Sequence, residues 1–129
     1  MNWWNKPKYG NKKLTTTDGK FDSKLEYYRW CELVILEKSK KISDLKRQVK
    51  FVLIPAQREP DIIGKRGGIK KGKLIEQECS YYADFTYIDK NGNFVVEDAK
   101  GYKGGDAYAL FVVKRKLMLY VHKIKVKEV

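Results

Sequence analysis

Histidine, cysteine and long hydrophobic runs are all scarce in this chain. His122 is the one histidine, which disfavours both a histidine-dependent catalytic triad and a zinc site. The two cysteines, Cys31 and Cys79, lack CxxC spacing and are typical of reduced cytoplasmic thiols. No apolar run approaches the roughly 20 residues that cross a membrane, and the start of the sequence does not resemble a signal peptide. We therefore expect a cytoplasmic protein without a membrane partner or a small-molecule cofactor.

Acidic residues are the next class in short supply. Asp and Glu together number 16, against 28 Lys and Arg, so the formal net charge is +12. A basic excess of this size favours binding to a polyanion, and nucleic acid is the commonest polyanion in cells. The alternative is a charge that only keeps the protein in solution.

Hydrophobic periodicity predicts one α/β domain over residues 1–129, with a single mixed sheet and flanking helices. Residues 1–20 are polar and basic and suggest an N-terminal arm. Residues 58–76 are glycine-rich and basic and suggest an inserted loop. The remaining elements are expected in the order α-β-β-β-α-β: a helix at 23–40, strands at 46–54, 83–88 and 94–101, a helix at 106–121 and a strand at 124–127.

Two basic segments are candidate DNA contacts because lysine and arginine neutralise backbone phosphates. One is the 58–76 loop, and the other is the expected second helix. The alternative interpretation of both segments is a solvated charged surface without a partner. The residues concerned are Lys65, Arg66, Lys70, Lys71 and Lys73 in the loop and Lys114 and Lys116 on the helix.

The first helix carries more apolar surface than one neighbouring element can cover. Tyr27 and Trp30 belong to an apolar stripe at helical spacing, while Leu25 and Tyr28 lie outside that stripe. This excess predicts a second contact, for which a homodimer is the simplest candidate.

Two acidic residues and a lysine share one predicted hairpin. Asp98 and Lys100 are two residues apart, so their side chains point to the same face of a strand. If Lys90–Gly92 forms a three-residue loop, Asp84 lies opposite Asp98. Facing carboxylates about 5 Å apart repel each other. A bound divalent cation would turn that repulsion into attraction.

A second register fits the same residues. A two-residue turn at Asn91–Gly92 would place Asp84 opposite Ala99, on the face of Glu97, and Lys100 would leave the site. In a third interpretation the acids are solvated charges on an ordinary hairpin. Spacing alone does not choose among these three.

Four phrases of the sequence, taken in order, resemble the PD-(D/E)XK nuclease superfamily. They resemble more closely a phage-encoded family of small nucleases that is related to Holliday-junction resolvases. The superfamily has an α-β-β-β-α-β, restriction-endonuclease-like core, which matches the order of elements expected here. The phrases are Lys8–Lys13, Phe21–Lys24 with Glu26, Ala83–Phe85 and Val96–Gly101.

The resemblance implies roles for individual residues. Asp84, Asp98 and the main-chain carbonyl of Ala99 would hold Mg²⁺ or Mn²⁺ through hard oxygen ligands. Lys100 would position the attacking water or stabilise the transition state. Glu26 would complete the catalytic and metal site from the first helix.

Two details depart from the family pattern or allow a second interpretation. Ala83 stands where the superfamily name has proline. The doublet Glu97–Asp98 leaves open which acid is the ligand, although Asp98 is in phase with Lys100. Ser23 and Glu26 also form a capping box, so Glu26 is either a catalytic residue or only a helix cap.

The resulting hypothesis is a Mg²⁺-dependent endodeoxyribonuclease that cuts branched DNA such as Holliday junctions during recombination. The symmetric cuts that a junction needs would suit a homodimer. If the gene is phage-encoded, the protein would act in the host cytoplasm. The alternatives are a DNA-binding module without catalysis and a nicking or restriction-type nuclease acting on duplex DNA.

Overall fold

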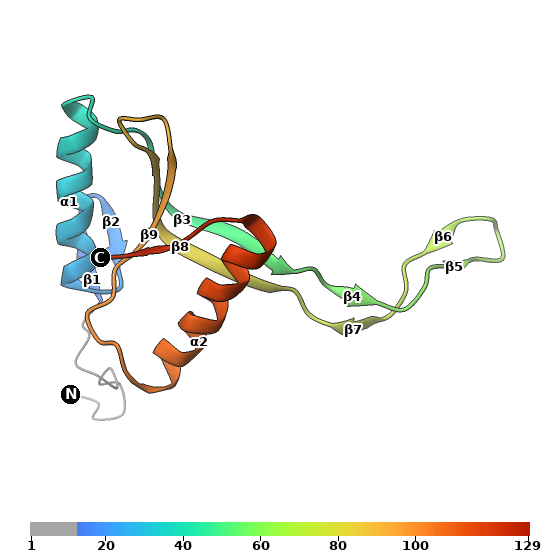
Figure 1. Cartoon of the computed structure of the whole chain (residues 1–129). Helices are drawn as coiled ribbons and strands as arrows, with labels where there is room; N and C mark the ends of the chain where they lie inside the picture. Colours follow the sequence, from blue (N-terminus) through green and yellow to red (C-terminus); the bar gives the residue numbers. More distant parts are fainter. Residues whose placement is uncertain (1–12) are drawn as a thin grey trace.

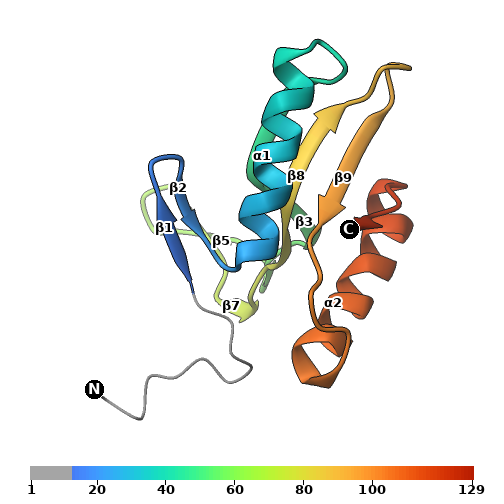
Figure 2. The ribbon, with the colours of Figure 1, turned by 90° about the vertical axis from the view of Figure 1, so that its left-hand side faces the viewer.

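The computed structural model describes residues 13–129 and contains a central mixed sheet of four strands with two helices (Figure 1, Figure 2). The strand order is β10-β9-β8-β3; β10 runs parallel to β9, and the other neighbouring pairs are antiparallel. The predicted α/β fold class and the α-β-β-β-α-β order are confirmed. These core elements are α1 (Lys24–Lys38), β3 (Ser43–Ile54), β8 (Cys79–Ile88), β9 (Phe94–Asp98), α2 (Gly105–Leu117) and β10 (Lys127–Glu128).

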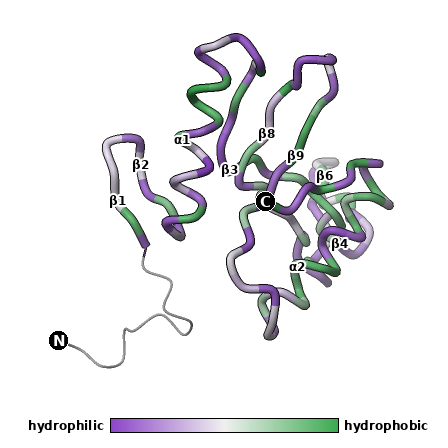
Figure 3. The backbone as a smooth tube through the Cα atoms, turned by 60° about the vertical axis from the view of Figure 1, so that its left-hand side comes forward, coloured by the Kyte–Doolittle hydropathy of each residue, from purple (hydrophilic) through white to green (hydrophobic). Residues whose placement is uncertain are grey.

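The hairpin formed by β8 and β9 has the three-residue loop. The pair of Phe85 with Glu97 fixes the register, and continuing this register by one residue toward the open end of the hairpin places Asp84 opposite Asp98. At the turn, the N–H of Asp89 donates to the carbonyl of Asn93 (2.8 Å). The side chain of Asp89 also accepts the N–H of Asn93 (2.9 Å), which closes the loop. Figure 3 shows this turn as a hydrophilic segment between the two strands.

The sheet carries two separate apolar clusters, and each helix belongs to one of them. Leu33 of α1 packs with Phe85 and Tyr87, at the end of the sheet nearest the β8–β9 turn. Phe111 of α2 packs with Tyr81 and Ala83 at the other end. Asp84 therefore lies on β8 at the point where one cluster ends and the other begins. A polar side chain at this boundary can face a gap between the helices.

Helix α1 begins where the capping box predicts. Ser23 is the N-cap, and its Oγ accepts the N–H of Glu26 (3.1 Å). The Glu26 Oε2 accepts the N–H of Asp22 (3.1 Å), so the glutamate also fixes the chain that enters the helix.

The described part of the predicted N-terminal arm contains regular β-structure. Strands β1 (Leu14–Thr16) and β2 (Gly19–Phe21) form an antiparallel hairpin. Arg47 of β3 donates to the carbonyl of Lys20 (2.7 Å) and stacks 3.7 Å from the centre of the Phe21 ring. Side-chain contacts from β3 thus hold a segment whose composition is that of a loop. Residues 1–12, which make up the rest of the arm and most of the Lys8–Lys13 phrase, lie outside the described residues.

The segment 58–76, predicted as a loop, is instead a β-ribbon that continues β3 and β8 and projects away from both helices (Figure 1). The glycines that suggested a loop serve its turn and its strand contacts. A Cβ atom on Gly72 would lie 1.7 Å from the carbonyl oxygen of Glu59, so only glycine fits between the two strands. The ribbon strands are β4 (Gln57–Arg58), β5 (Ile62–Ile63), β6 (Ile69–Lys70) and β7 (Leu74–Glu76).

Some element boundaries also differ from the sequence prediction. Strand β3 starts at Ser43, three residues before the predicted start at Lys46. The second helix, predicted to end at residue 121, is α-helical only as far as Leu117 and is followed by a π-helical turn, η2 (Met118–His122). The last strand is Lys127–Glu128, later than predicted. Among the described residues, neither helix has the length and apolar content needed to span a bilayer.

Candidate functional site

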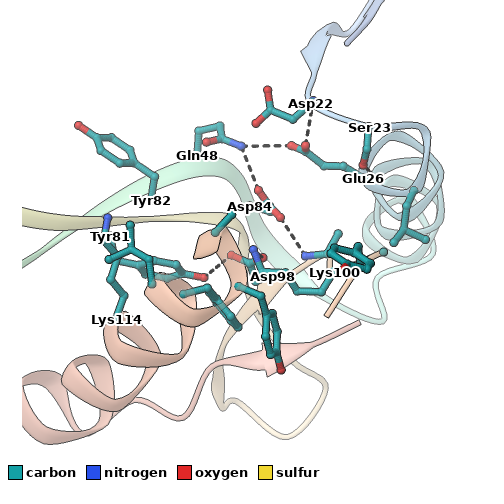
Figure 4. Close-up of a pocket in the computed structure, with 18 of the residues that line it drawn as sticks. Asp22, Ser23, Glu26, Gln48, Tyr81, Tyr82, Asp84, Asp98, Lys100 and Lys114 are labelled. Atoms are coloured by element: carbon teal, nitrogen blue, oxygen red, sulfur yellow. Dashed lines mark hydrogen bonds and ion pairs between the residues drawn. The ribbon is translucent and has the colours of Figure 1, made fainter. Parts of the chain in front are cut away.

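An open cleft of about 810 Å³ lies between the start of α1, the middle of β8 and the first half of α2 (Figure 4). It contains the predicted catalytic residues together with polar and aromatic side chains. Glu26 enters from α1, Gln48 from β3 and Asp84 from β8, while Asp98 and Lys100 come from the end of β9. Residues of both helices line the cleft, with the start of α1 on one side and the first half of α2 on the other.

The two aspartates of the hairpin are close neighbours in this cleft. Asp84 Oδ2 accepts the backbone N–H of Ala99 (2.8 Å), the residue that follows Asp98. Asp98 Oδ2 accepts the hydroxyl of Tyr81 (2.6 Å). Burial and the charge of Asp98 raise the pKa of Tyr81, so the phenol stays protonated and remains a donor.

The acid pair is electrostatically unfavourable without a cation. Burial, followed by the negative charge of Asp98, raises the pKa of Asp84 to about 7. The N–H of Ala99 and the charge of Lys100 oppose this rise but do not overcome it. Near neutral pH, Asp84 is therefore poised between its protonated and charged forms, and positive charge entering the cleft would favour the charged form.

Lys100 has the predicted position beside Asp98. Its Nζ lies 2.7 Å from Asp98 Oδ1 and 4.2 Å from the centre of the Phe111 ring. The aromatic face on one side and the carboxylate on the other fix the ammonium group at the cleft wall. A phosphate that enters the cleft would meet this positive charge.

Glu26 and Gln48 form the α1 side of the cleft. Gln48 Nε2 donates to Glu26 Oε1 (3.1 Å) and to Asp84 Oδ1 (3.3 Å), so the amide lies between the two acids (Figure 4). Burial raises the pKa of Glu26, with the N–H of Asp22 opposing the rise. Glu26 is thus both a helix cap and a cleft residue, so its two interpretations are compatible in this structure. Its link to the aspartate pair runs through Gln48.

Gln48 is held in an unusual backbone conformation for a strand residue. Its φ is 51°, in the left-handed region that non-glycine residues rarely adopt. Such strain is often found at functional sites. The position of Gln48 near the site had no signal in the sequence pattern, because a glutamine in a strand is an ordinary surface residue.

The structure separates the two acids of the Glu97–Asp98 doublet. Glu97 is fully buried, away from the cleft, where Arg29 of α1 binds both of its oxygens (2.8 Å each) and the Tyr87 hydroxyl donates to it. Burial tends to raise the pKa of Glu97, but the Arg29 and Tyr87 hydrogen bonds outweigh it and lower the pKa. Glu97 therefore has a structural partner, and Asp98 is the member of the doublet that faces the cleft.

The predicted DNA-binding residues fall into three places. Lys114 lines the cleft, on the same side as Tyr81 and Phe111. Lys116 lines a second hollow beside Leu119 and β10, and does not face the acids. Lys65, Arg66, Lys70, Lys71 and Lys73 all lie on the projecting ribbon.

The donor atoms of the cleft suit a magnesium or manganese ion. Across residues 13–129 no group of three or more histidine, cysteine or acidic side chains is arranged to hold a metal. Mg²⁺, however, is often held by one or two carboxylates together with substrate phosphates, and Asp84 and Asp98 supply that number. Asp98 Oδ1 is buried and accepts no hydrogen bond from the described residues, with Lys100 as its ion-pair partner. The carbonyl of Ala99 remains a predicted third oxygen.

Comparison with protein families gives one match. Residues 6–128 match the model of a family described as "Protein of unknown function (DUF1064)". This match covers nearly the whole chain, including the cleft, the ribbon and both helices. No curated protein and no solved structure matches the chain.

Proposed function

The chain belongs to the DUF1064 family, and we propose that it is a Mg²⁺- or Mn²⁺-dependent DNA endonuclease of the PD-(D/E)XK type. The observation that carries this proposal is the facing pair of Asp84 and Asp98 with Lys100 beside it. Burial and, after it, the charge of Asp98 raise the pKa of Asp84, and a cation between the two carboxylates would offset both effects.

The cleft residues divide the work of phosphodiester hydrolysis. Asp84 and Asp98 would hold the ion, which when bound supplies positive charge for the phosphate and lowers the pKa of a water molecule. Lys100 donates hydrogen bonds to the scissile phosphate or to the attacking water. Gln48 fixes the side chain of Asp84, while Glu26 accepts from Gln48 and orders the start of α1. Tyr81 keeps Asp98 in position through its hydroxyl.

DNA is the substrate that the charge distribution favours. The chain carries a net charge of +12, and Lys114 lines the same cleft as the acids. A basic residue beside the acid pair can bind the phosphate backbone and offset the negative charge of the aspartates. The projecting ribbon carries further lysines.

We also propose that the substrate is branched DNA and that the protein acts as a homodimer. On α1, Leu25, Tyr28 and Ile35 remain 41%, 59% and 64% exposed after the helix has packed on the sheet. An apolar face of this kind is suited to a second copy of the chain, and two-fold symmetry would supply two cuts. Sedimentation of the protein should then give a dimer, and replacing Ile35 with lysine should give a monomer.

The direct test is cleavage of a labelled four-way junction by purified protein with Mg²⁺ or Mn²⁺. Asp98→Ala should reduce the cleavage rate by about 1,000-fold, the size expected when transition-state charge stabilisation is lost, while binding to the junction persists. Asp106→Ala is the matched control, because Asp106 is an exposed acid in the first turn of α2.

Three outcomes separate the candidate functions. Cleavage that disappears in Asp98→Ala supports the nuclease. Binding without cleavage under either metal leaves a DNA-binding module. Equal cleavage of junction, flap and linear duplex would indicate a nicking or restriction-type nuclease instead of a junction enzyme.

A further inference from the structure

The outer end of the β-ribbon, residues 62–73, combines strong positive charge with exposed apolar side chains. We name this segment the ribbon tip. It contains no acidic residue, and β5 and β6 form its strands. Its basic residues are Lys65, Arg66, Lys70, Lys71 and Lys73.

Two isoleucines form a pair at this tip. Ile63 on β5 lies directly opposite Ile69 on β6, and each is 78% exposed. The N–H of Gly64 donates to the carbonyl of Gly68 (2.7 Å), which closes the loop. The neighbouring isoleucine pair is therefore a non-hydrogen-bonded one, in which cross-strand side chains are closest. The pair forms one apolar edge just behind the basic loop.

The fold does not use this apolar edge. Neither isoleucine belongs to an apolar cluster of the described chain, and the ribbon projects away from both helices (Figure 1). The pair stabilises the ribbon by at most about 1 kcal/mol through its cross-strand contact. A polar β-branched pair such as threonine would also support a strand, and would expose much less hydrocarbon surface. The choice of isoleucine at both positions thus points to a partner.

The charge of the tip decides which partner it suits. A second copy of the chain would bring two basic tips together, and the like charges would repel. DNA supplies phosphates for the lysines and arginine, and base pairs provide flat apolar faces once stacking is interrupted. Inserting an apolar wedge into continuous duplex costs a few kcal/mol of unstacking per step. At a branch point that stacking is already broken, so the cost is smaller.

We propose that the ribbon tip recognises the branch point of DNA. The isoleucine pair packs against the exposed base-pair faces there, and the tip lysines and Arg66 bind the flanking phosphates. This inference rests on the proposed function for the nature of the partner, although it requires neither metal nor cleavage. The ribbon would distinguish branched from linear DNA, and the cleft would carry out the hydrolysis.

The test replaces both isoleucines with threonine, which keeps β-branched side chains and removes apolar surface. Ile75→Thr is the matched control, because Ile75 lies on β7 of the same ribbon, outside the tip, and is 60% exposed. Binding to a four-way junction and to linear duplex of equal length is measured in EDTA, so that no cleavage occurs. A 2-aminopurine base placed at the branch point reports changes in the contacts of the exposed base faces there.

The Ile63→Thr/Ile69→Thr variant should bind the junction about tenfold more weakly, equal to roughly 1.4 kcal/mol, and should bind linear duplex as the wild type does. The 2-aminopurine signal of the junction should change on binding of the wild type and the control, but not of the variant. Unchanged junction affinity would overturn the proposal. Equal losses on both DNAs would also overturn it, because they would mean that the isoleucines only maintain the ribbon.

The two proposals fail in different ways. If the protein binds and distinguishes junctions in EDTA but never cleaves with metal, the nuclease proposal is wrong and the ribbon proposal stands. If it cleaves, but the threonine variant keeps its preference for junctions, the ribbon proposal alone is wrong.

Discussion

Replacing Asp84 with asparagine should stabilise the protein at alkaline pH when no metal is present. Asparagine has nearly the shape of aspartate, and its Oδ1 can still accept the N–H of Ala99. Its Nδ2 then replaces the oxygen that accepts from Gln48, so this one 3.3 Å hydrogen bond is lost. The substitution removes the buried negative charge that faces Asp98. The cleft would lose its electrostatic repulsion while its packing stays the same.

The structure gives both the sign and the size of this effect. The folded pKa of Asp84 is raised from its ordinary value of 3.8 to about 7. The folded state therefore binds the proton more tightly than the unfolded state does. The associated stability is present below pH 4 and is lost as pH rises through 7. A tenfold change in acidity corresponds to about 1.4 kcal/mol, so the upper limit is roughly 4 kcal/mol; partial solvent exposure of the carboxyl reduces this to about 2 kcal/mol.

Thermal unfolding at a series of pH values measures this prediction. In EDTA at pH 8, Asp84→Asn should melt about 6 °C above the wild type, and the difference should vanish near pH 4. Adding Mg²⁺ at pH 8 should raise the melting temperature of the wild type, because binding to the folded state stabilises it, and should leave the variant nearly unchanged. Asp106→Asn, at an exposed position on α2, should behave as the wild type does. A variant less stable than the wild type at pH 8 in EDTA would refute the reasoning.

Two further substitutions test other parts of the fold. Glu97→Ala should lower the free energy of unfolding by about 3–5 kcal/mol, because it leaves Arg29 without the buried carboxylate that it binds. Urea unfolding would measure this loss, and a loss below about 1 kcal/mol would contradict the prediction. Gly72→Ala should break the ribbon pairing locally, because the new Cβ atom would overlap the carbonyl of Glu59. Amide hydrogen exchange should then become faster in the ribbon but not in β8. Unchanged exchange in the ribbon would show that the strands can separate there without cost.

Interactions between residues close in the sequence are sufficient to predict several elements of the fold. The Ser23–Glu26 capping box determines where α1 begins, because the hydrogen bonds involved join residues at most four apart. The hydrophobic pattern likewise predicted the order of the core elements. For the hairpin, the sequence allows two registers. In the structure the side chain of Asp89 accepts the N–H groups of Asn91 and Asn93, and these hydrogen bonds stabilise the three-residue loop.

Other features depended on residues far apart in the chain. Gln48 reaches Asp84 because β3 pairs with β8, and its φ of 51° has no sequence signal in a strand. Glu97 is excluded from the cleft by Arg29, a residue 68 positions earlier. The composition of the glycine-rich segment 58–76 predicts a loop. It does not reveal that the segment extends the pairing of β3 with β8, or that the chain segments approach closely at Gly72.

The types of side chain and their local conformation are thus predictable from the chain, since capping, alternation and turn closure act over a few residues. Which acids share the cleft, and which lysines accompany them, depends on how distant segments pack together. Lys114 and Lys116 are two residues apart, yet Lys114 lines the cleft and Lys116 lines the hollow beside β10. The physical reason is that a helix or strand fixes the direction of each side chain, while long-range packing fixes what lies in that direction.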